Sequence, residues 1–557
     1  MLKTRFDGLV SENEYIHIKK ELGREPNEFE LHLFSATYSE HCSYKHSREL
    51  LKLLPRKNAI FYEENAGGIE LGEHAILFKM ESHNHPCAVE PFNGAATGVG
   101  GIIRDVLAMN ARPIALCNSL KFGSKCNRII NGVVEGISLY GNSIGVPTVS
   151  TEVLFDDCFS ENPLVNVSAI GIAKISDILT SNTAKNGLKL MLVASATMRD
   201  GMGGAAFASK KLSNEKAEDK ISIQIANPFM KKKLIEACLE IFSQKLAVSC
   251  QDCGAAGILS STSEVAYKSG CGVEIDLSQI HIGDKSIKDF EIMLSETQER
   301  MLFVIEETNI EKIAWILKKF ELEYSVIGNT TEKKNYVVKN GTNVLANLPC
   351  ELLVTPPEIE LEFGQNARGI LGGMVIPPYG GVDGNCPEIY EQYDHTVGAR
   401  TCFSPSNTEL YSKQPDFDLS SRSGIPARQH KTPWYENPQF NALWIYEENC
   451  FLGVYTFSVV IEKNPFKEVY EAILTASKSL TELGFQPKGI TNCLNFANPE
   501  ISPTMYEFRE TILAIKKACE ELKIPVCSGN VSFYNECSLG KIKNTPSFTL
   551  IGVKTES

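Results

Sequence analysis

Two short stretches of this chain recur in the same order at long range. The sequence LKFG at 120–123 ends a strand-like run and resembles LNFA at 494–497, an offset of 494 − 120 = 374 residues. PTVS at 147–150 resembles PVCS at 525–528, an offset of 525 − 147 = 378 residues. Chance similarity between short strands is the alternative explanation, but the preserved order favours a duplication. A period this long indicates duplicated whole domains and not a solenoid.

A chain of 557 residues is too long for one hydrophobic core, since a domain usually has roughly 100–200 residues. Short apolar runs alternate with glycine turns and amphipathic patterns, which is typical of α/β structure. HAILFKME and RPIALCNSL are expected strands, and IIRDVLAMNA between them is an expected helix. We expect a helical N-terminal segment with a capping box from Ser11 to Glu14. The predicted order is helical segment, two α/β units, linker and a last α/β unit, at 1–50, 51–175, 176–354, 355–435 and 436–557.

Charge and hydropathy argue against several classes of protein. The net charge of −13 disfavours a general nucleic-acid binder, although a local phosphate site remains compatible with it. No uninterrupted apolar run reaches the roughly 18 residues of a membrane-spanning helix. The N-terminus, MLKTRFDGLV, is charged where a signal peptide would be apolar. We therefore expect a cytoplasmic protein that binds neither nucleic acid nor membrane.

The 17 cysteines are expected to be reduced thiols, because they are scattered along a long chain that is not exported. Cys250 and Cys253 form one C-x-x-C pair, and a zinc site would want a second pair. Packed thiols are the simpler interpretation, with a redox pair as the alternative.

The most polar and glycine-rich window is FKMESHNHPCAVEPFNGAATGVGGIIRD at 78–105. Glu81 ends a strand-like run, where a carboxylate can bind Mg²⁺. His83 and His85 share a face of extended chain, so that one could act as a base and the other as a substrate contact. Arg104 offers a planar fork for phosphate and Asp105 a second metal ligand. Glycines at 94, 98, 100 and 101 are expected to free backbone N–H groups to approach an anion before the helix. The whole set favours a phosphate site, and a glycine-rich turn with capping side chains is the alternative.

Four further stretches concentrate polar residues, and each taken alone is also typical of an ordinary turn or helix end. They are SEHCSYKHSR with His41 and Tyr44, QDCGAAGILSS with Asp252, MLSETQERM with Glu296, Thr297 and Gln298, and SGNVSFYNE with Gly529, Asn530 and Ser532. None matches the P-loop or the G-x-G-x-x-G dinucleotide motif, so a common nucleotide fold is not supported.

Taken together, these stretches resemble the formylglycinamide ribonucleotide amidotransferases (phosphoribosylformylglycinamidine synthases), in the small form that is a synthetase subunit. GREPNEFEL, RDGMGGAAFAS, NPFMKKKLIEACLE and TNCLNFANPE also match, so the resemblance spans nearly the whole chain in order. It implies an α/β (α+β) fold of tandem aminoimidazole-ribonucleotide-synthetase-like halves. Each half has a barrel-forming domain and a second α/β domain, and the two barrel-forming domains pack face to face. The family continues beyond the position of Ser557, so the second half is expected to be incomplete, without its final α/β domain.

The resemblance also implies an activity. In this family ATP phosphorylates the amide oxygen of formylglycinamide ribonucleotide, and ammonia then displaces phosphate to give formylglycinamidine ribonucleotide, a step of purine biosynthesis. The implied cofactor is Mg²⁺, with ATP as a substrate. The implied partners are a separate glutaminase subunit, which supplies the ammonia, and a small accessory subunit.

Roles are implied position by position. The resemblance implies His41 and His83 as catalytic, Tyr44, Lys79, Asn492 and Gly529 as ATP contacts, Glu81, Asp105, Asp252 and Asn530 as Mg²⁺ ligands, and Ser82, His83, Asn84, His85, Arg104, Gln224, Glu296, Thr297, Gln298 and Ser532 as substrate contacts.

Several positions depart from the family pattern. Asn492 replaces an Asp, Gly203 a His and Thr297 a Ser, and the latter half has no counterpart of ESHNHP. The missing counterpart of ESHNHP and the missing final α/β domain together imply that the family's auxiliary nucleotide site is lost. A catalytically inactive or substrate-shifted relative, which binds nucleotide or partner subunits, is the alternative to an active ligase. The retained polar set favours the ligase: Glu81, His83, Arg104, Asp105 and Asp252.

Overall fold

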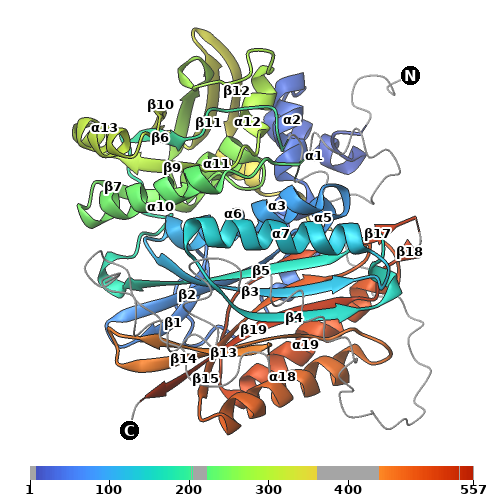
Figure 1. Cartoon of the computed structure of the whole chain (residues 1–557). Coiled ribbons are helices and arrows are strands. Elements are labelled where there is room, and N and C mark those ends of the chain that lie inside the picture. Colours follow the sequence, from blue (N-terminus) through green and yellow to red (C-terminus); the bar gives the residue numbers. More distant parts are fainter. Residues whose placement is uncertain (1–7, 202–203, 205–222, 360–437, 539, 556–557) are drawn as a thin grey trace.

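The computed structural model describes residues 8–201, 204, 223–359, 438–538 and 540–555 (Figure 1). The predicted linker at 355–435 lies almost wholly outside these residues, and so does Gly203. The domain boundaries given above stay predictions.

The N-terminal segment is helical, as expected. Its helices are α1 (Glu12–Leu22), α2 (Glu28–Thr37), α3 (Glu40–Ser43) and α4 (Arg48–Leu51). The predicted capping box is confirmed, because the Ser11 hydroxyl accepts from the Glu14 N–H and the Glu14 carboxylate accepts from the Ser11 N–H. A second capping box joins Asn27 and Glu30 at the start of α2.

The next unit is a five-stranded sheet with the strand order β1-β2-β5-β3-β4. Its strands are β1 (Gly67–Leu71), β2 (His74–Ser82), β3 (Arg112–Phe122), β4 (Thr148–Phe155) and β5 (Leu164–Lys174), and its helices are α5 (Asn84–Val89), α6 (Pro91–Ala108) and α7 (Asn127–Ile144). β3 and β4 are parallel with α7 between them, and the other pairs are antiparallel.

The last unit repeats this topology strand for strand, in the order β13-β14-β19-β15-β16. It consists of β13 (Phe440–Ile445), β14 (Cys450–Ser458), β15 (Gln486–Asn495), β16 (Val526–Ser532) and β19 (Thr545–Thr555), with α18 (Pro465–Glu482) and α19 (Thr504–Leu522). LKFG lies at the end of β3 and LNFA at the end of β15, while PTVS begins at β4 and PVCS at β16. The duplication predicted from the sequence is confirmed.

The two five-stranded sheets pack face to face through a shared apolar layer. Phe78 and Ile170 from the first sheet meet Leu452 and Ile551 from the second in this layer. Figure 1 shows α6 and α7 covering the outer face of the first sheet and α18 and α19 that of the second. The described strands form separate sheets and no closed barrel, so the barrel implied by the resemblance is not seen here.

The unit between them is a seven-stranded mixed sheet of order β12-β11-β8-β10-β6-β9-β7. It comprises β6 (Lys189–Ala194), β7 (Ala247–Asp252), β8 (Gly272–Asp276), β9 (Arg300–Ile305), β10 (Tyr324–Thr331), β11 (Asn335–Asn340) and β12 (Asn343–Pro349), with α10 (Pro228–Ser243), α11 (Gly257–Ser269), α12 (Asp289–Leu294), α13 (Ile310–Lys319) and α14 (Cys350–Val354). One continuous core joins Ile102 on α6, Ile137 on α7, Leu234 on α10 and Phe303 on β9. Helix α6 is therefore buried between two sheets, which brings its polar residues towards the end of β7.

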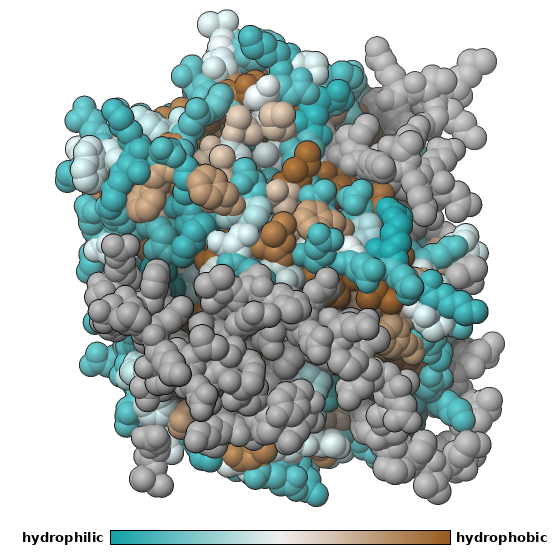
Figure 2. Space-filling view, viewed as in Figure 1, coloured by the Kyte–Doolittle hydropathy of each residue, from teal (hydrophilic) through white to brown (hydrophobic). Residues whose placement is uncertain are grey.

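Surface and thiols agree with a folded protein whose cysteines are reduced. On the face shown in Figure 2, hydrophilic residues cover most of the seven-stranded unit, and hydrophobic ones gather near the level of α3, α5 and α6. Every cysteine in the described ranges is free, including the buried Cys250 and Cys253. Among the described helices, none is long and apolar enough to span a bilayer.

The glycine run is not the loop that the sequence suggested. Helix α6 already begins at Pro91, so the four glycines lie inside it and their N–H groups serve the helix. The physical reason is close packing, since a Cβ at Gly94 would lie 2.5 Å from the carbonyl carbon of Pro86. A Cβ at Gly98 would lie 3.0 Å from the His83 ring, and one at Gly100 would lie 2.6 Å from the Tyr140 hydroxyl. The glycines thus make room for neighbouring groups and do not bind an anion with their backbone.

Two alanine substitutions in α6 should have opposite effects. Gly94→Ala should lower the free energy of unfolding by about 2–3 kcal/mol, because its Cβ would meet backbone atoms. Gly101→Ala meets its nearest atom at 3.6 Å and gains helix propensity, so it should leave stability unchanged or raise it by about 0.5–1 kcal/mol. Denaturant unfolding of both variants checks this, and equal losses would contradict the packing explanation.

An ion pair between β3 and α10 should make stability depend on pH. Arg112 donates to Glu236 at 3.1 and 3.0 Å. Burial opposes ionisation of Glu236, but Arg112 and Lys232 outweigh it and lower its pKa to about 2. The folded pKa lies below the unfolded value of about 4.3, so this stabilisation is present above pH 4.3 and is lost as the pH falls towards 2.

Glu236→Gln should therefore lower the free energy of unfolding by about 1–2 kcal/mol at pH 7, after allowance for partial exposure, and by less at pH 3. Urea unfolding at the two pH values measures the difference. Glu321→Gln is the matched control, because Glu321 pairs with Lys233 while 80% exposed and should change little at either pH. An equal loss at both pH values for Glu236→Gln would contradict the assignment.

Candidate active site

The larger of two adjoining pockets holds about 800 Å³ of space between atoms, part of it open to solvent. All four residues predicted to contact ATP line it, namely Tyr44, Lys79, Asn492 and Gly529. They come from the end of α3, from β2, and from the neighbouring strands β15 and β16. Both duplicated units thus contribute to one pocket.

Short contacts fix the wall of this pocket. The Asn530 amide donates to the Tyr44 hydroxyl at 3.3 Å and accepts from the Ser82 hydroxyl at 3.1 Å. Gly529 lies beside Asn492, where a Cβ would be 2.7 Å from the Asn492 Oδ1. Glycine is therefore required there if the buried Asn492 amide is to keep its position.

Three functional side chains converge over the bare face of α6 at Gly101. An ideal Cβ on Gly101 would lie 3.6 Å from the Glu81 carboxylate, 3.7 Å from His83 Nε2 and 4.0 Å from the Arg104 guanidinium. Lys79 and Glu81 are two residues apart on β2, so their side chains lie on the same face of the sheet. This is the face that α6 covers. A carboxylate, an imidazole and a guanidinium group thus lie close to one small volume.

Charged pairs surround this point. Lys79 pairs with Asp105 at 2.9 Å, and Arg104 with Asp252 at 3.5 Å. Burial would favour neutral Lys79, but Asp105 and Glu81 outweigh it and raise its pKa. Burial also opposes ionisation of Glu81, but the surrounding positive charge, that of Lys79 above all, outweighs it and lowers its pKa.

For Asp105 and two histidines, burial determines the direction of the pKa shift and favours the neutral form. Burial raises the pKa of Asp105 well above its ordinary value, with Asp252 and Glu81 adding to the effect and Lys79 only partly offsetting it. Burial lowers the pKa of His41 and of His83, while Glu81 partly opposes the shift in both. The imidazoles are therefore neutral near pH 7 and can accept a proton.

Carboxylates outnumber nearby cations here, which suits a divalent cation. No group of three or more His, Cys, Asp or Glu residues in the described ranges is already arranged around a single metal position. Mg²⁺ commonly takes only one or two carboxylates, with water and substrate phosphates completing its shell. Glu81, Asp105 and Asp252 lie around Lys79 and Arg104 with their oxygens on one side of α6, so they fit such an ion.

The SETQ stretch lies beside the same centre. The Gln298 side-chain oxygen accepts from Arg104. Glu296 accepts from Gln224 at 2.7 Å and from the N–H of Ala256 at 3.0 Å. Thr297 donates to Asp200 at 2.7 Å. The predicted substrate contacts of the seven-stranded unit are therefore brought together and joined to Arg104.

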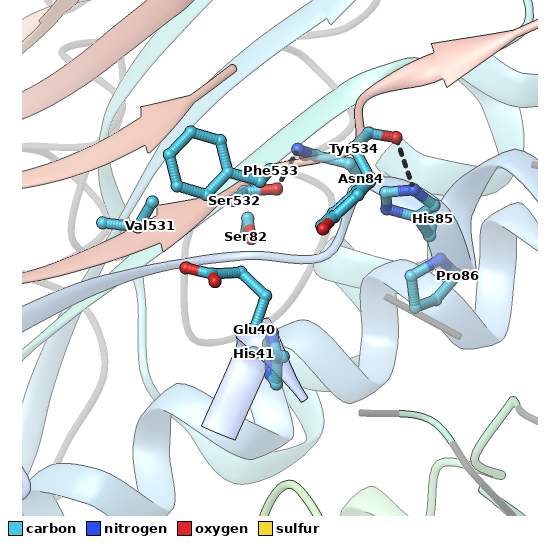
Figure 3. A pocket seen from close by; sticks show the side chains of 10 residues that line it. All are labelled: Glu40, His41, Ser82, Asn84, His85, Pro86, Val531, Ser532, Phe533 and Tyr534. Carbon is cyan, nitrogen blue, oxygen red and sulfur yellow. Dashed lines mark hydrogen bonds between the residues drawn. The ribbon is translucent and has the colours of Figure 1, made fainter. Parts of the chain in front are cut away.

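The smaller pocket adjoins the loop after β2 (Figure 3). Its lining includes His41, Ser82, Asn84, His85 and Ser532, all of them predicted site residues. His85 Nε2 lies 3.2 Å from the Tyr534 carbonyl oxygen, as Figure 3 shows. Most predicted site residues thus line the two pockets or lie beside Lys79 and Arg104. Gln224, Glu296 and Thr297 lie in the neighbouring hydrogen-bond network of the SETQ stretch.

A buried acid–base cluster behind Arg104 was not predicted. Glu299 accepts from the Tyr140 hydroxyl and pairs with Lys231 at 2.6 Å, and Lys231 is fully buried. Burial lowers the pKa of Lys231 to about 8, although Glu299 opposes the shift. One signal was available, since Lys231 occupies the apolar face of α10 with Leu234 and Ile235.

Family models match most of the chain. The model described as "AIR synthase related protein, N-terminal domain" matches twice, at 63–173 and 453–554, and its C-terminal counterpart matches 185–340. The "Formylglycinamide ribonucleotide amidotransferase linker domain" matches 7–45.

Proteins that are similar over nearly the whole chain indicate the same family as the domain models. The phosphoribosylformylglycinamidine synthase subunit PurL of Petrotoga mobilis is 41% identical over 564 residues, covering 98% of this chain and 73% of the relative. The subunit from Carboxydothermus hydrogenoformans is 39% identical over 581 residues, covering 99% and 75%. The structure "T. maritima PurL complexed with FGAR" superposes with a TM-score of 0.81 at 35% identity, covering 97% of this chain and 83% of that one. "T. maritima PurL complexed with ATP" gives 0.78 at 33%, covering 97% and 82%.

The duplicated fold and the whole-chain relatives identify an ATP-dependent ligase of the AIR-synthase-related class. The chain belongs to the PurL family, the synthetase subunits of phosphoribosylformylglycinamidine synthase. The predicted family, fold class and purine-biosynthetic ligase activity are confirmed at this level.

Gly529→Ala should weaken nucleotide binding selectively. The new Cβ would push the buried Asn492 amide away from the pocket wall. We expect the Kd of ATP, measured by calorimetry, to rise about tenfold, which corresponds to about 1.4 kcal/mol. The melting temperature and the affinity for formylglycinamide ribonucleotide should stay close to those of the wild type. An unchanged ATP affinity would place the nucleotide elsewhere.

Proposed function

We propose that the two pockets form one active site, in which ATP lies in the larger pocket and formylglycinamide ribonucleotide reaches the point over Gly101. The observation that carries this is the position of Lys79, which lines the nucleotide pocket and also pairs with Asp105 beside Glu81. Phosphate bound by Lys79 would therefore be next to the group of Glu81, His83 and Arg104.

The reaction proceeds in two displacements. The substrate amide oxygen attacks the γ-phosphorus of ATP, and ADP leaves with the electrons of the broken P–O bond. Ammonia then adds to the activated carbon, and the C–O bond breaks to release phosphate with the former amide oxygen. His83 takes a proton from the attacking nitrogen, while Arg104 and Lys79 hold the phosphoryl oxygens. Catalysis rests on positioning and charge neutralisation more than on a covalent enzyme intermediate.

Mg²⁺ would be held by Glu81, Asp105 and Asp252, with Asn530 at the nucleotide side. When bound, it would neutralise the charge of the transferring phosphoryl group. The structure "PurLQS from Thermotoga maritima", with a TM-score of 0.80 at 33% identity, covers 98% of this chain and 83% of that one. It supports the proposal that a separate glutaminase and a small subunit dock on this cytoplasmic chain.

The second unit is proposed to hold no nucleotide. The repeat offset makes Glu152 equivalent to Asn530, since 530 − 152 = 378. Glu152 pairs at 2.8 Å with Lys121, which is fully buried, and accepts from the N–H of Ser458 at 3.0 Å. Protein groups thus fill the position that the repeat makes equivalent to Asn530 of the nucleotide pocket.

His83→Ala should reduce kcat by about 10²–10⁴-fold, because a positioned base is removed. Phosphate release from ATP with formylglycinamide ribonucleotide, Mg²⁺ and a high ammonium concentration measures it. His74→Gln is the matched control, since His74 begins β2, which ends just before His83, but pairs with Glu448 outside both pockets. Comparable losses in the two variants would contradict the role of His83.

In that assay, wild-type chain that binds nucleotide but does not turn over would favour the inactive or substrate-shifted alternative. Asn492→Asp then tests the clearest departure at the nucleotide pocket. If Asn492→Asp leaves the ATP affinity unchanged, the asparagine at this position is not the reason for the missing turnover.

A further inference from the structure

Glu40 is a buried carboxylate in the smaller pocket that the predicted site did not include. It lies in the first turn of α3 and is only 5% exposed. It lines the pocket together with His41, Ser82 and Ser532.

Only one of its two oxygens is used by the protein. Glu40 Oε2 lies 2.6 Å from His46 Nδ1 and accepts from the His46 N–H at 3.1 Å. Glu40 Oε1 is buried and has no hydrogen-bond partner among the described residues. A buried carboxylate oxygen without a donor is costly, so natural proteins usually supply one.

The Glu40 carboxylate is directed at the pocket. Figure 3 shows the Glu40 carboxylate directed towards the strands that carry Ser82 and Ser532. The two contacts to His46 fix the opposite oxygen, so the carboxylate cannot turn away to find another partner.

The pocket's charge narrows the class of ligand. Lys79 and Arg104, the cations placed for phosphate, are not part of its lining, whereas Glu40 is. A carboxylate oxygen repels phosphate and accepts from N–H or O–H donors. The proposed reaction brings two nitrogen donors to this site, the amide of the substrate and ammonia.

We propose that Glu40 Oε1 accepts a hydrogen bond from a nitrogen that takes part in the reaction. This inference rests on the proposed function. Glu40 binds and orients the nitrogen, and it forms no covalent bond. The two sources of the N–H donor, ammonia and the substrate amide, make different kinetic predictions.

Glu40→Gln tests the proposal sharply. His46 presents two donors, so the Gln carbonyl oxygen should take their place and turn the NH₂ group into the pocket. The group facing the ligand then changes from an acceptor to a donor. We expect the KM of the bound nitrogen species to rise about tenfold or more, which is about 1.4 kcal/mol. The KM of ATP should not change.

Steady-state assays with ammonium chloride, varying one substrate at a time, separate the two sources. A rise in the KM of ammonia alone identifies ammonia as the ligand. A rise in the KM of formylglycinamide ribonucleotide alone identifies the substrate. Glu14→Gln is the matched control, because Glu14 is a buried carboxylate of the same segment, bonded to Lys45 and Ser11 and outside both pockets.

If Glu40→Gln does not fold, Glu40→Asp carries the same test, since it keeps the charge but withdraws the oxygen from the pocket. If the wild-type chain turns over and the folded variant keeps all three KM values, this inference is overturned and the proposed function is not. A fall in kcat that accompanies a lower melting temperature with unchanged KM values would have the same consequence. Absence of turnover by the wild-type chain would overturn the proposed function, and this inference with it.

Discussion

The active site depends on one buried amide, that of Asn84. Its Oδ1 accepts from the Val165 N–H at 2.8 Å, and its Nδ2 lies 2.8 Å from Asn495, 3.2 Å from Ser532 and 3.0 Å from Asn535. These contacts join the loop after β2 to both its own sheet and the duplicated sheet. A buried amide pays a large penalty for any lost partner, so the loop has one position. That position puts Glu81 and His83 over α6 while Ser82 contacts the second unit.

Much of the fold could be predicted from local pattern. The repeated LKFG and LNFA stretches predicted a duplicated unit because strand ends keep their sequence, and the strand order confirms it. The glycine run was misread because helix propensity counts glycine as a breaker, whereas here the cost is offset by tight packing of His83 and Tyr140. The face-to-face packing of the two sheets involves residues hundreds of positions apart, which no local pattern encodes.

The sequence predicted many residues of the site but not the contacts between them. Polar clusters at strand ends indicated Glu81 and Asp252, the glycine-rich window indicated Arg104, and the resemblance assigned their roles. Glu40 and Lys231 escaped notice because their importance comes from burial, which only the tertiary structure reveals. The pairing of Gln298 with Arg104 likewise depends on how α6 packs under the seven-stranded unit. Sequence therefore identified the chemistry, and packing supplied the geometry.

The central claim is that this site phosphorylates an amide oxygen. The most direct measurement uses formylglycinamide ribonucleotide labelled with ¹⁸O at that amide, incubated with ATP, Mg²⁺ and ammonium. Mass spectrometry of the released phosphate then reports where the label goes. The account predicts one labelled oxygen in each phosphate formed by turnover. Phosphate without label would contradict it, since the nucleotide would then be hydrolysed by water or spent in another step.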